Sequence, residues 1–346
     1  MLQNVLPLEP LEPLDSLESL ESLIREAKEG ISFDRTISRR LVHRASVTEV
    51  FLTDAIMAGS GRFLVGAQLP RNHALFRPEG AGRADFMLLV EVVRQAGIFL
   101  SHRYHDVPLG HHFIFKALSL HIADPAALGV GGGPLGIVLD VKAVTPEGPR
   151  NPRRFDARFD MVIEVGGREC ARASAGVTVI DGVRYARIRQ RGRAARPIGT
   201  GPAGTPAGGY GDGRGVLCPV PGTVPVPGTG AAGTREWRLH VDPAHPGYFE
   251  HPSDHVPGML ILEAFRQAAL LACRPGGSVG VPGAGPEVFP DSATGALVSM
   301  DTEFRAFGEL SAPVTVDATP AGDGRVRLSA TQGGRVLAAG VARRTA

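Results

Sequence analysis

The stretch from residue 86 to residue 100, FMLLVEVVRQAGIFL, carries apolar side chains on every side except at Glu91, Arg94 and Gln95. It is too long for an ordinary β-strand, and a helix that is apolar all round belongs in a protein core. A second stretch of the same kind, MLILEAFRQAALLA, covers residues 259–272. The sequence therefore predicts two buried helices.

These two helices belong to an internal repeat with a shift of 172 residues. At that shift residues 73–96 fall on residues 245–268 without a gap, and seven of the 24 positions are identical. About two identities would be expected by chance from average residue usage. A long period with one buried helix in each copy indicates a duplicated domain and not a solenoid.

Short apolar or alternating runs, bounded by turn residues, surround each helix and predict β-strands. The expected strands are residues 47–52, 62–69, 112–122, 136–144, 155–165 and 171–180 in the first copy, and 236–241, 296–304, 313–318, 325–330 and 336–342 in the second. We therefore expect two sheets, each wrapped around one helix, that pack together as a pseudo-dimer.

Four parts are predicted along the chain. They are a low-complexity N-terminal extension (1–34), a first repeat (35–188), a Gly/Pro-rich linker (189–234) and a second repeat (235–346). Leucine stands at every third position early in the extension, which draws no stable stripe on a helix, so we expect at most a short helix near residues 20–28. The linker has little to bury and is not expected to sustain a helix.

Composition limits the possible functions. The 346 residues include 37 Lys+Arg and 35 Asp+Glu, so the formal net charge is only +2 and nucleic acid is not an expected partner. No apolar run is long enough to span a membrane. Cys170, Cys218 and Cys273 form neither a disulfide framework nor a zinc spacing. We expect a soluble, cytoplasmic protein.

Two cofactor signals are weak. Residues 131–136, GGGPLG, fit Gly-x-Gly-x-x-Gly, but a strand-like run follows, so no helix N-terminus would face a dinucleotide phosphate. Four histidines lie between residues 102 and 112, with only Asp106 among them as a carboxylate. Solvated loop histidines are the favoured interpretation. We expect neither a cofactor nor a metal.

Glu91, Arg94 and Gln95 stand at i, i+3 and i+4, so they project from one face of the first helix. Buried charges are costly unless they are paired, and one interpretation is an ion pair that fixes the helix to its neighbours. The lead-in to the second helix, HPGYFEHPSDHVPGM at residues 245–259, favours a catalytic role instead. It places several titratable groups, including His251, directly before a helix, and a His and a Glu together suit acid–base chemistry.

A His, a Pro-Gly turn and a helix of the form L-x-x-E-A-x-x-Q resemble the hotdog fold of the bacterial β-hydroxyacyl-ACP dehydratases. In those enzymes the His and the helix carboxylate act together at a subunit interface. Their His is followed by Phe-Pro-Gly, whereas Pro252-Ser253-Asp254 follows His251 here. This departure argues against a dehydratase mechanism.

A closer resemblance runs from about residue 41 to the end of the chain. It is to the A-factor-type γ-butyrolactone biosynthesis family (AfsA-like), which is built as two hotdog repeats. The resemblance implies an α+β fold with two hotdog domains in tandem, each an antiparallel sheet wrapped around one central helix, packed as a pseudo-dimer. The matching blocks are VHR at 42–44 with EVFLTD at 49–54, AQLPRNH at 67–73, EVVRQAG at 91–97, FEHPSDHVPGM at 249–259 and EAFRQA at 263–268.

The family resemblance also implies an activity, which is transfer of a β-ketoacyl group from an acyl-carrier-protein thioester to the hydroxyl of dihydroxyacetone phosphate. This would be the first step towards a γ-butyrolactone signalling molecule. A carboxylate could accept the hydroxyl proton, an Arg could hold the phosphate and an apolar cavity could hold the acyl chain. A hotdog dehydratase or thioesterase, and a non-catalytic regulatory protein that binds a small ligand, remain alternatives.

We expect one dominant site, and the sequence does not determine which helix serves it. The expected catalytic residues are Glu91, Glu263 and His251, and the expected substrate-binding residues are Arg94, Arg266, Gln95, Gln267, His73 and His255. The Arg-rich run at 184–196 is either a solvated linker edge or a dock for an acidic carrier protein. A homo-oligomer is compatible with the sequence.

Overall fold

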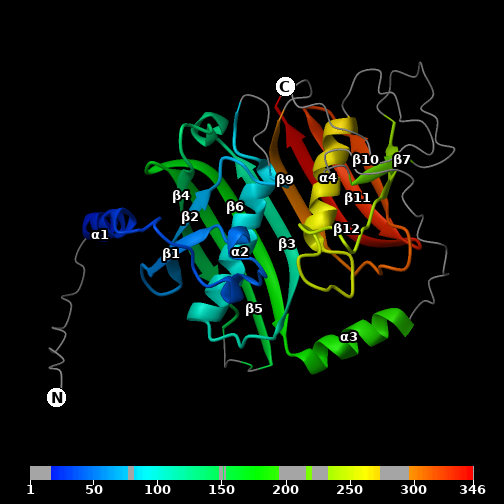
Figure 1. Cartoon of the computed structure of the whole chain (residues 1–346), viewed down its shortest axis with the longest axis horizontal. Coiled ribbons are helices and arrows are strands. Elements are labelled where there is room, and N and C mark those ends of the chain that lie inside the picture. The colour runs from blue at the N-terminus through cyan, green and yellow to red at the C-terminus, as the bar shows by residue number, and fades with distance from the viewer. Residues whose placement is uncertain are drawn as a thin grey trace.

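A computed structural model describes residues 17–76, 82–147, 151, 153–194, 216–219, 233–272 and 296–345. In these residues the chain forms a 12-stranded sheet whose order is β1-β2-β4-β5-β6-β3-β9-β12-β11-β10-β8-β7. Figure 1 shows that helices α2 (Phe86–Tyr104) and α4 (Gly258–Ala272) lie side by side on one face of this sheet. Each helix crosses the half of the sheet that its own repeat supplies.

The first six strands belong to the first repeat. They are β1 (Leu52–Met57), β2 (Arg62–Leu69), β3 (His112–Ile122), β4 (Leu135–Val144), β5 (Arg154–Val165) and β6 (Arg168–Ile180). The second repeat contributes β7 (Leu217–Pro219), β8 (Arg235–Leu239), β9 (Leu297–Phe304), β10 (Thr315–Pro320), β11 (Arg325–Gln332) and β12 (Arg335–Arg344). The other helices are α1 (Leu17–Glu29), α3 (Gly182–Ala194) and three 3-10 helices, η1 (Arg39–Val42), η2 (Val47–Glu49) and η3 (Pro125–Leu128).

The two halves join where β3 pairs with β9. This antiparallel pairing runs from Ala117 opposite Glu303 to His121 opposite Ser299. It makes one sheet out of two, so neither half leaves an open edge at the junction. The pseudo-dimer is therefore held by a backbone ladder as well as by the contact between α2 and α4.

Helix α2 is the core of the first half. It begins at Asp85, whose carboxylate accepts the backbone N–H groups of Met87 at 2.7 Å and Leu88 at 3.3 Å. Nearly all its side chains are buried, including Leu89 and Val93. Each such aliphatic side chain contributes about 1.5–3 kcal/mol by leaving water, which fixes the helix against the sheet.

Most expected strands and both expected core helices are confirmed, with shifts of a few residues at their ends. The strand expected at 47–52 is wrong, because the Ser46 hydroxyl accepts the N–H of Thr48 and caps the 3-10 turn η2. The first 16 residues lie outside the described part. Beyond them α1 is longer than expected, and Lys28 near its end pairs with Glu164 at 2.6 Å.

The expectation that the linker holds no helix is wrong at its start, in the Arg-rich run. Most of it forms α3, which continues past residue 189, where the linker was expected to begin. Arg, Gln and Ala are good helix formers, and the Asp181 carboxylate accepts the N–H of Arg184 at 2.8 Å near the helix start. The domain boundaries drawn from the sequence stay predictions. No helix in the described residues is both long and apolar enough to cross a membrane.

Gly340 tests the packing of β12 on β9. A Cβ at this position would clash with the carbonyl oxygen of Asp301, which is a backbone atom that cannot move aside alone. We expect Gly340→Ala to destabilise the protein by about 1–3 kcal/mol and to lower its Tm by several degrees in a thermal melt. Gly132→Ala is the control, because nothing lies within 4 Å of its added Cβ. Equal melting of both variants would contradict the register.

Candidate active site at the junction of the repeats

The Glu91 carboxylate is the centre of a buried charge cluster on α2. It receives Arg44 Nη2 at 2.6 Å, Arg94 Nε at 2.7 Å and Gln95 Nε2 at 2.7 Å. Its side chain is fully buried, which by itself would raise the pKa of Glu91. The charges of Arg44 and Arg94 outweigh burial and lower this pKa to about 2. Such a carboxylate holds guanidinium groups and is a poor proton acceptor.

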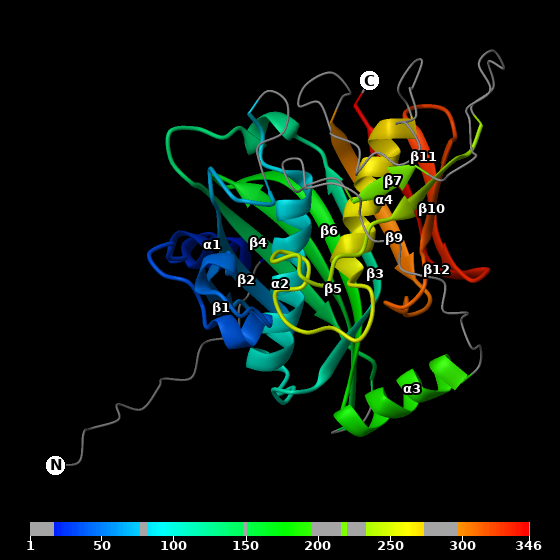
Figure 2. The ribbon, with the colours of Figure 1, turned by 45° about the vertical axis from the view of Figure 1, so that its right-hand side comes forward.

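Arg44 links this cluster to the second repeat through an ion pair. Its Nη1 donates to Glu250 Oε2 at 2.9 Å, and Glu250 also accepts the backbone N–H groups of Ala45 at 3.0 Å and Ser46 at 2.8 Å. Glu250 lies in the segment that leads into α4, which Figure 2 shows passing beside α2. This segment of the second repeat is therefore fastened to the first.

His43 and His102 form a pair beside the cluster. Their Nε2 atoms are 2.8 Å apart, and His102 Nδ1 lies 2.7 Å from the carbonyl oxygen of Val107. Because a carbonyl only accepts, His102 Nδ1 carries a hydrogen. In a neutral His102 the Nε2 atom therefore carries no hydrogen, and it accepts a hydrogen bond from the Nε2–H of His43. A neutral His43 is left with an unprotonated Nδ1.

His43 has two further marks of a functional residue. Its backbone is left-handed, with φ 54° and ψ 49°, which is uncommon for a residue other than glycine and clusters at functional sites. Burial, and then the charges of His102, Arg94 and His251, lower the pKa of His43 to about 3. His43 therefore lies within electrostatic reach of Arg94 and His251, two residues predicted for the site.

Some side chains of this group reach the protein surface. Arg94 has 15 % of its side chain exposed, His43 is half-buried and His251 is exposed. The structure thus brings Arg94, His251 and His43 together from α2, from the segment before α4 and from the turn after η1.

Glu263 on α4 repeats part of this arrangement. It receives Arg266 Nη2 and Gln267 Nε2, both at 2.6 Å. Among the described residues no second Arg contacts Glu263. Burial, and then the charge of Glu263, raise the pKa of Tyr248 well above its ordinary range.

The two Gln residues hold their helices in place. Gln95 Nε2 donates to the carbonyl of Glu49 at 2.7 Å, and its Oε1 accepts the N–H of Phe51 at 3.0 Å. Gln267 Oε1 accepts the N–H of Val216 at 2.9 Å. In the described residues, both side chains bond to neighbouring backbone groups and so position their helices.

His73 and its counterpart His245 share a local role. The Nδ1 of His73 accepts the N–H groups of Leu75 and Phe76, both at 3.1 Å. The Nδ1 of His245 likewise accepts the backbone N–H groups two and three residues further on. Each His closes a turn. The two repeats therefore share this hydrogen-bond pattern as well as their sequence.

His255 lies towards α3. Its Nδ1 is 2.8 Å from Asp254 Oδ1 and 3.3 Å from the Tyr185 hydroxyl. Burial lowers the pKa of His255, and Asp254 partly opposes this. Among the described residues, no group of three or more His, Cys, Asp or Glu side chains is arranged to hold a metal ion.

Sequence reasoning missed His43, Arg44 and Glu250 as site residues. All three lie in the blocks that carried the family resemblance, but none is on a core helix. The pairing of Arg44 with Glu250 joins residues that are 206 positions apart, which no local pattern reveals.

Glu91→Gln tests the charge cluster. Above pH 4.5, the ordinary pKa of Glu, the ionised carboxylate stabilises the folded state, and this contribution is lost as the pH falls through about 2. We expect the variant to be less stable by about 3–5 kcal/mol near pH 7, and the difference to shrink on acidification. Denaturant unfolding at several pH values measures it.

The matched control is Glu169→Gln, which breaks an exposed i,i+3 pair with Arg172. It should cost less than about 1 kcal/mol. A difference between Glu91→Gln and the parent protein that does not change with pH would contradict the assignment of an ionised Glu91.

Comparison with known proteins shows which family the chain belongs to. The family model described as the A-factor biosynthesis hotdog domain matches residues 27–181 and 223–346. The chain is 33% identical to 2-oxo-3-(phosphooxy)propyl 3-oxoalkanoate synthase from Streptomyces virginiae, covering 86% of this chain and 93% of that protein. It is 31% identical to the enzyme of the same name from Streptomyces coelicolor, covering 91% and 94% of the two chains.

Among solved structures, the chain is similar to an acyl-ACP thioesterase from Bacteroides thetaiotaomicron at 12% identity and a TM-score of 0.43, covering 82% of this chain and 98% of that one. It is also similar to the 12:0-ACP thioesterase from Umbellularia californica at 10% identity and a TM-score of 0.41, covering 82% and 97%.

The family match falls in two segments, one in each half of the antiparallel sheet, which confirms two hotdog domains in tandem. The relatives that cover nearly the whole chain are synthases with a single shared name. On this evidence the chain belongs to the A-factor biosynthesis hotdog family.

Proposed function

We propose that this protein transfers a β-ketoacyl group from an acyl-carrier-protein thioester to the hydroxyl of dihydroxyacetone phosphate. The names of the relatives support a 3-oxoalkanoate and a phosphooxypropyl group as the parts joined. The observation that carries the proposal is the neutral His43 with its unprotonated Nδ1 close to Arg94. A proton acceptor beside a cation is what a phosphorylated alcohol requires.

The reaction needs no covalent enzyme intermediate. The phosphate binds Arg94, with His251 beside it, and the acceptor hydroxyl donates its proton to His43 Nδ1 as its oxygen attacks the thioester carbonyl. A C–O bond forms and the C–S bond breaks. The His43 imidazolium then returns the proton to the leaving thiolate, so the products are an ester and a free carrier thiol.

The low pKa of His43 belongs to the site without substrate. Burial is its main cause, and the charges of His102 and Arg94 follow. A phosphate dianion bound to Arg94 adds negative charge near His43, which raises the pKa of His43. His43 is therefore a stronger base when the acceptor is bound than when the site is empty.

The Glu residues take supporting roles in this proposal. Glu91 fixes Arg94 and Arg44 and is held too tightly to act as the base. Glu263 and Arg266 form the corresponding pair on α4. The site on α2 is favoured because His43, Arg44 and Glu250 complete it.

A thioesterase or dehydratase of the same fold is the alternative enzyme, and a ligand-binding regulator is the alternative without chemistry. Mass analysis of products from a β-ketoacyl carrier thioester and dihydroxyacetone phosphate separates them. We expect the phosphorylated ester. Free β-keto acid alone, or no turnover, would each contradict the proposal.

His43→Ala tests the base. We expect kcat to fall by about 10²–10⁴-fold, because a general base contributes that much, while the protein stays folded. His121→Ala is the control, since His121 is exposed and contacts Asp301 outside the site. Wild-type kcat in His43→Ala would remove His43 from the mechanism.

Arg94→Ala tests phosphate recognition. We expect KM for dihydroxyacetone phosphate to rise at least about tenfold, with little change for unphosphorylated dihydroxyacetone, because the guanidinium acts through the phosphate charge. Arg266→Ala makes the same change on α4 and should have a smaller effect. The reverse order would assign the site to α4.

A further inference from the structure

Helix α3 is the most basic of the helices and strands in the described residues. Its 13 residues include five Arg and no acidic residue. One of them, Arg189, is buried and fixes the helix. Its Nε donates to Asp254 at 2.9 Å and its Nη2 to Glu309 at 2.8 Å. Because Asp254 lies in the segment before α4, α3 is anchored to the same segment that carries His251.

The other face of α3 is available to a partner. Arg187 and Arg191 are exposed and Arg184 is half-buried, and none of the three pairs with a carboxylate in the described residues. Beside these arginines in the helix, Val183 is 63 % exposed and Ile188 is 44 % exposed. Unpaired cations interspersed with apolar side chains fit an acidic protein surface that also buries apolar contacts.

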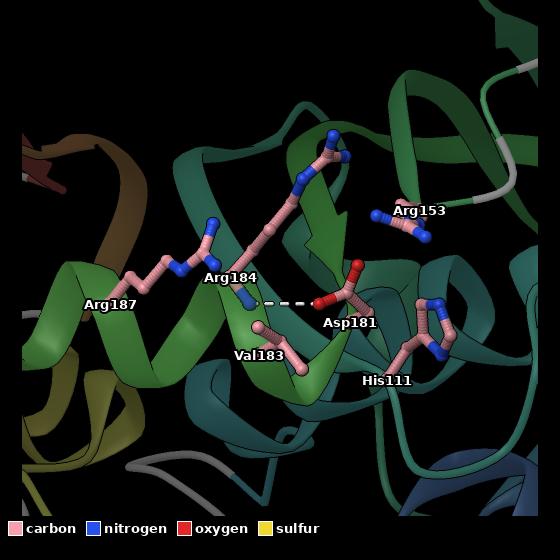
Figure 3. A pocket seen from close by; sticks show the side chains of 6 residues that line it. All are labelled: His111, Arg153, Asp181, Val183, Arg184 and Arg187. Atoms are coloured by element: carbon pink, nitrogen blue, oxygen red, sulfur yellow. Dashed lines mark hydrogen bonds between the residues drawn. The ribbon is translucent and has the colours of Figure 1, made fainter.

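A pocket of about 390 Å³ opens at the start of this helix. Figure 3 shows its lining residues, which are His111, Arg153, Asp181, Val183, Arg184 and Arg187. The Nε2 of His111 is buried without a hydrogen-bond partner in the described residues. The only carboxylate lining the pocket, Asp181, accepts the backbone N–H of Arg184. The three guanidinium groups of the lining, from Arg153, Arg184 and Arg187, suit a phosphate group.

This surface is connected to the proposed site. Tyr185 of α3 stacks on His112, with ring centroids 3.9 Å apart and an angle of 6° between the planes. Phe113, the residue after His112, contacts the His43 ring edge-on, with ring centroids 5.1 Å apart. A partner seated on α3 would therefore sit close to the proton acceptor.

We propose that the exposed face of α3 and the adjacent pocket form the docking surface for the acyl carrier protein. The acidic surface of the carrier contacts Arg184, Arg187 and Arg191, and the pocket takes the phosphate of its phosphopantetheine arm. The identity of this partner rests on the proposed function. The pattern of charged and apolar side chains on this surface is independent of the proposed function.

The test compares two acyl donors. The triple variant Arg184→Glu, Arg187→Glu, Arg191→Glu is assayed with the β-ketoacyl carrier protein and with a β-ketoacyl N-acetylcysteamine thioester, which has neither an acidic surface nor a phosphate. We expect kcat/KM for the carrier to fall at least about tenfold and to lose most of its salt dependence. Turnover of the small thioester should be unchanged.

A control variant carries the same change of charge elsewhere. Arg238→Glu, Arg327→Glu and Arg335→Glu alter exposed positions on β8, β11 and β12, and should leave both donors unaffected. Unchanged turnover of the carrier by the α3 variant would overturn the docking surface. An equal loss with both donors would also overturn it, since α3 would then act on the site itself. If the parent protein uses neither donor, the proposed function fails instead.

Discussion

The rest of this structure depends on one buried carboxylate. Glu91 lies in an otherwise apolar helix, where an unpaired charge would cost several kcal/mol, so it requires the guanidinium groups of Arg44 and Arg94. Arg44 then reaches Glu250 in the other repeat. A single ion-pair network thus holds the core helix, fixes Arg94 and ties the two hotdog domains together where the proposed chemistry takes place.

Duplication has produced two similar helices in unequal surroundings. Both carry Glu, Arg and Gln at the same spacing, and both follow a His that closes a turn. Their partners differ, however, because Arg44 gives Glu91 a second guanidinium, whereas no second Arg among the described residues contacts Glu263. The first helix therefore has a second cation on its carboxylate, and His43 is the residue next to that cation. One site can specialise while the other preserves the fold.

Much of the fold could be predicted because the spacing of apolar residues along a short segment shows whether that segment is a helix or a strand and which side is buried. The all-round apolar stretch at 86–100 indicated α2, and alternation indicated strands such as β3. Residues 47–52 misled because an exposed Val47 and a serine cap override strand propensity. For the proposed site, the sequence predicted Arg94 and His251 but not His43, which pairs with His102, 59 positions away. Contacts across such distances depend on the tertiary fold.

The central claim is that the proposed chemistry takes place on the α2 face, with His43 as base and Arg94 as phosphate ligand. A crystal structure with dihydroxyacetone phosphate and a non-reactive thioester analogue tests it most directly. We predict that the phosphate contacts Arg94 and that the acceptor hydroxyl lies within hydrogen-bond distance of His43 Nδ1. A phosphate bound at Arg266, with His43 facing no atom of either ligand, would contradict the account.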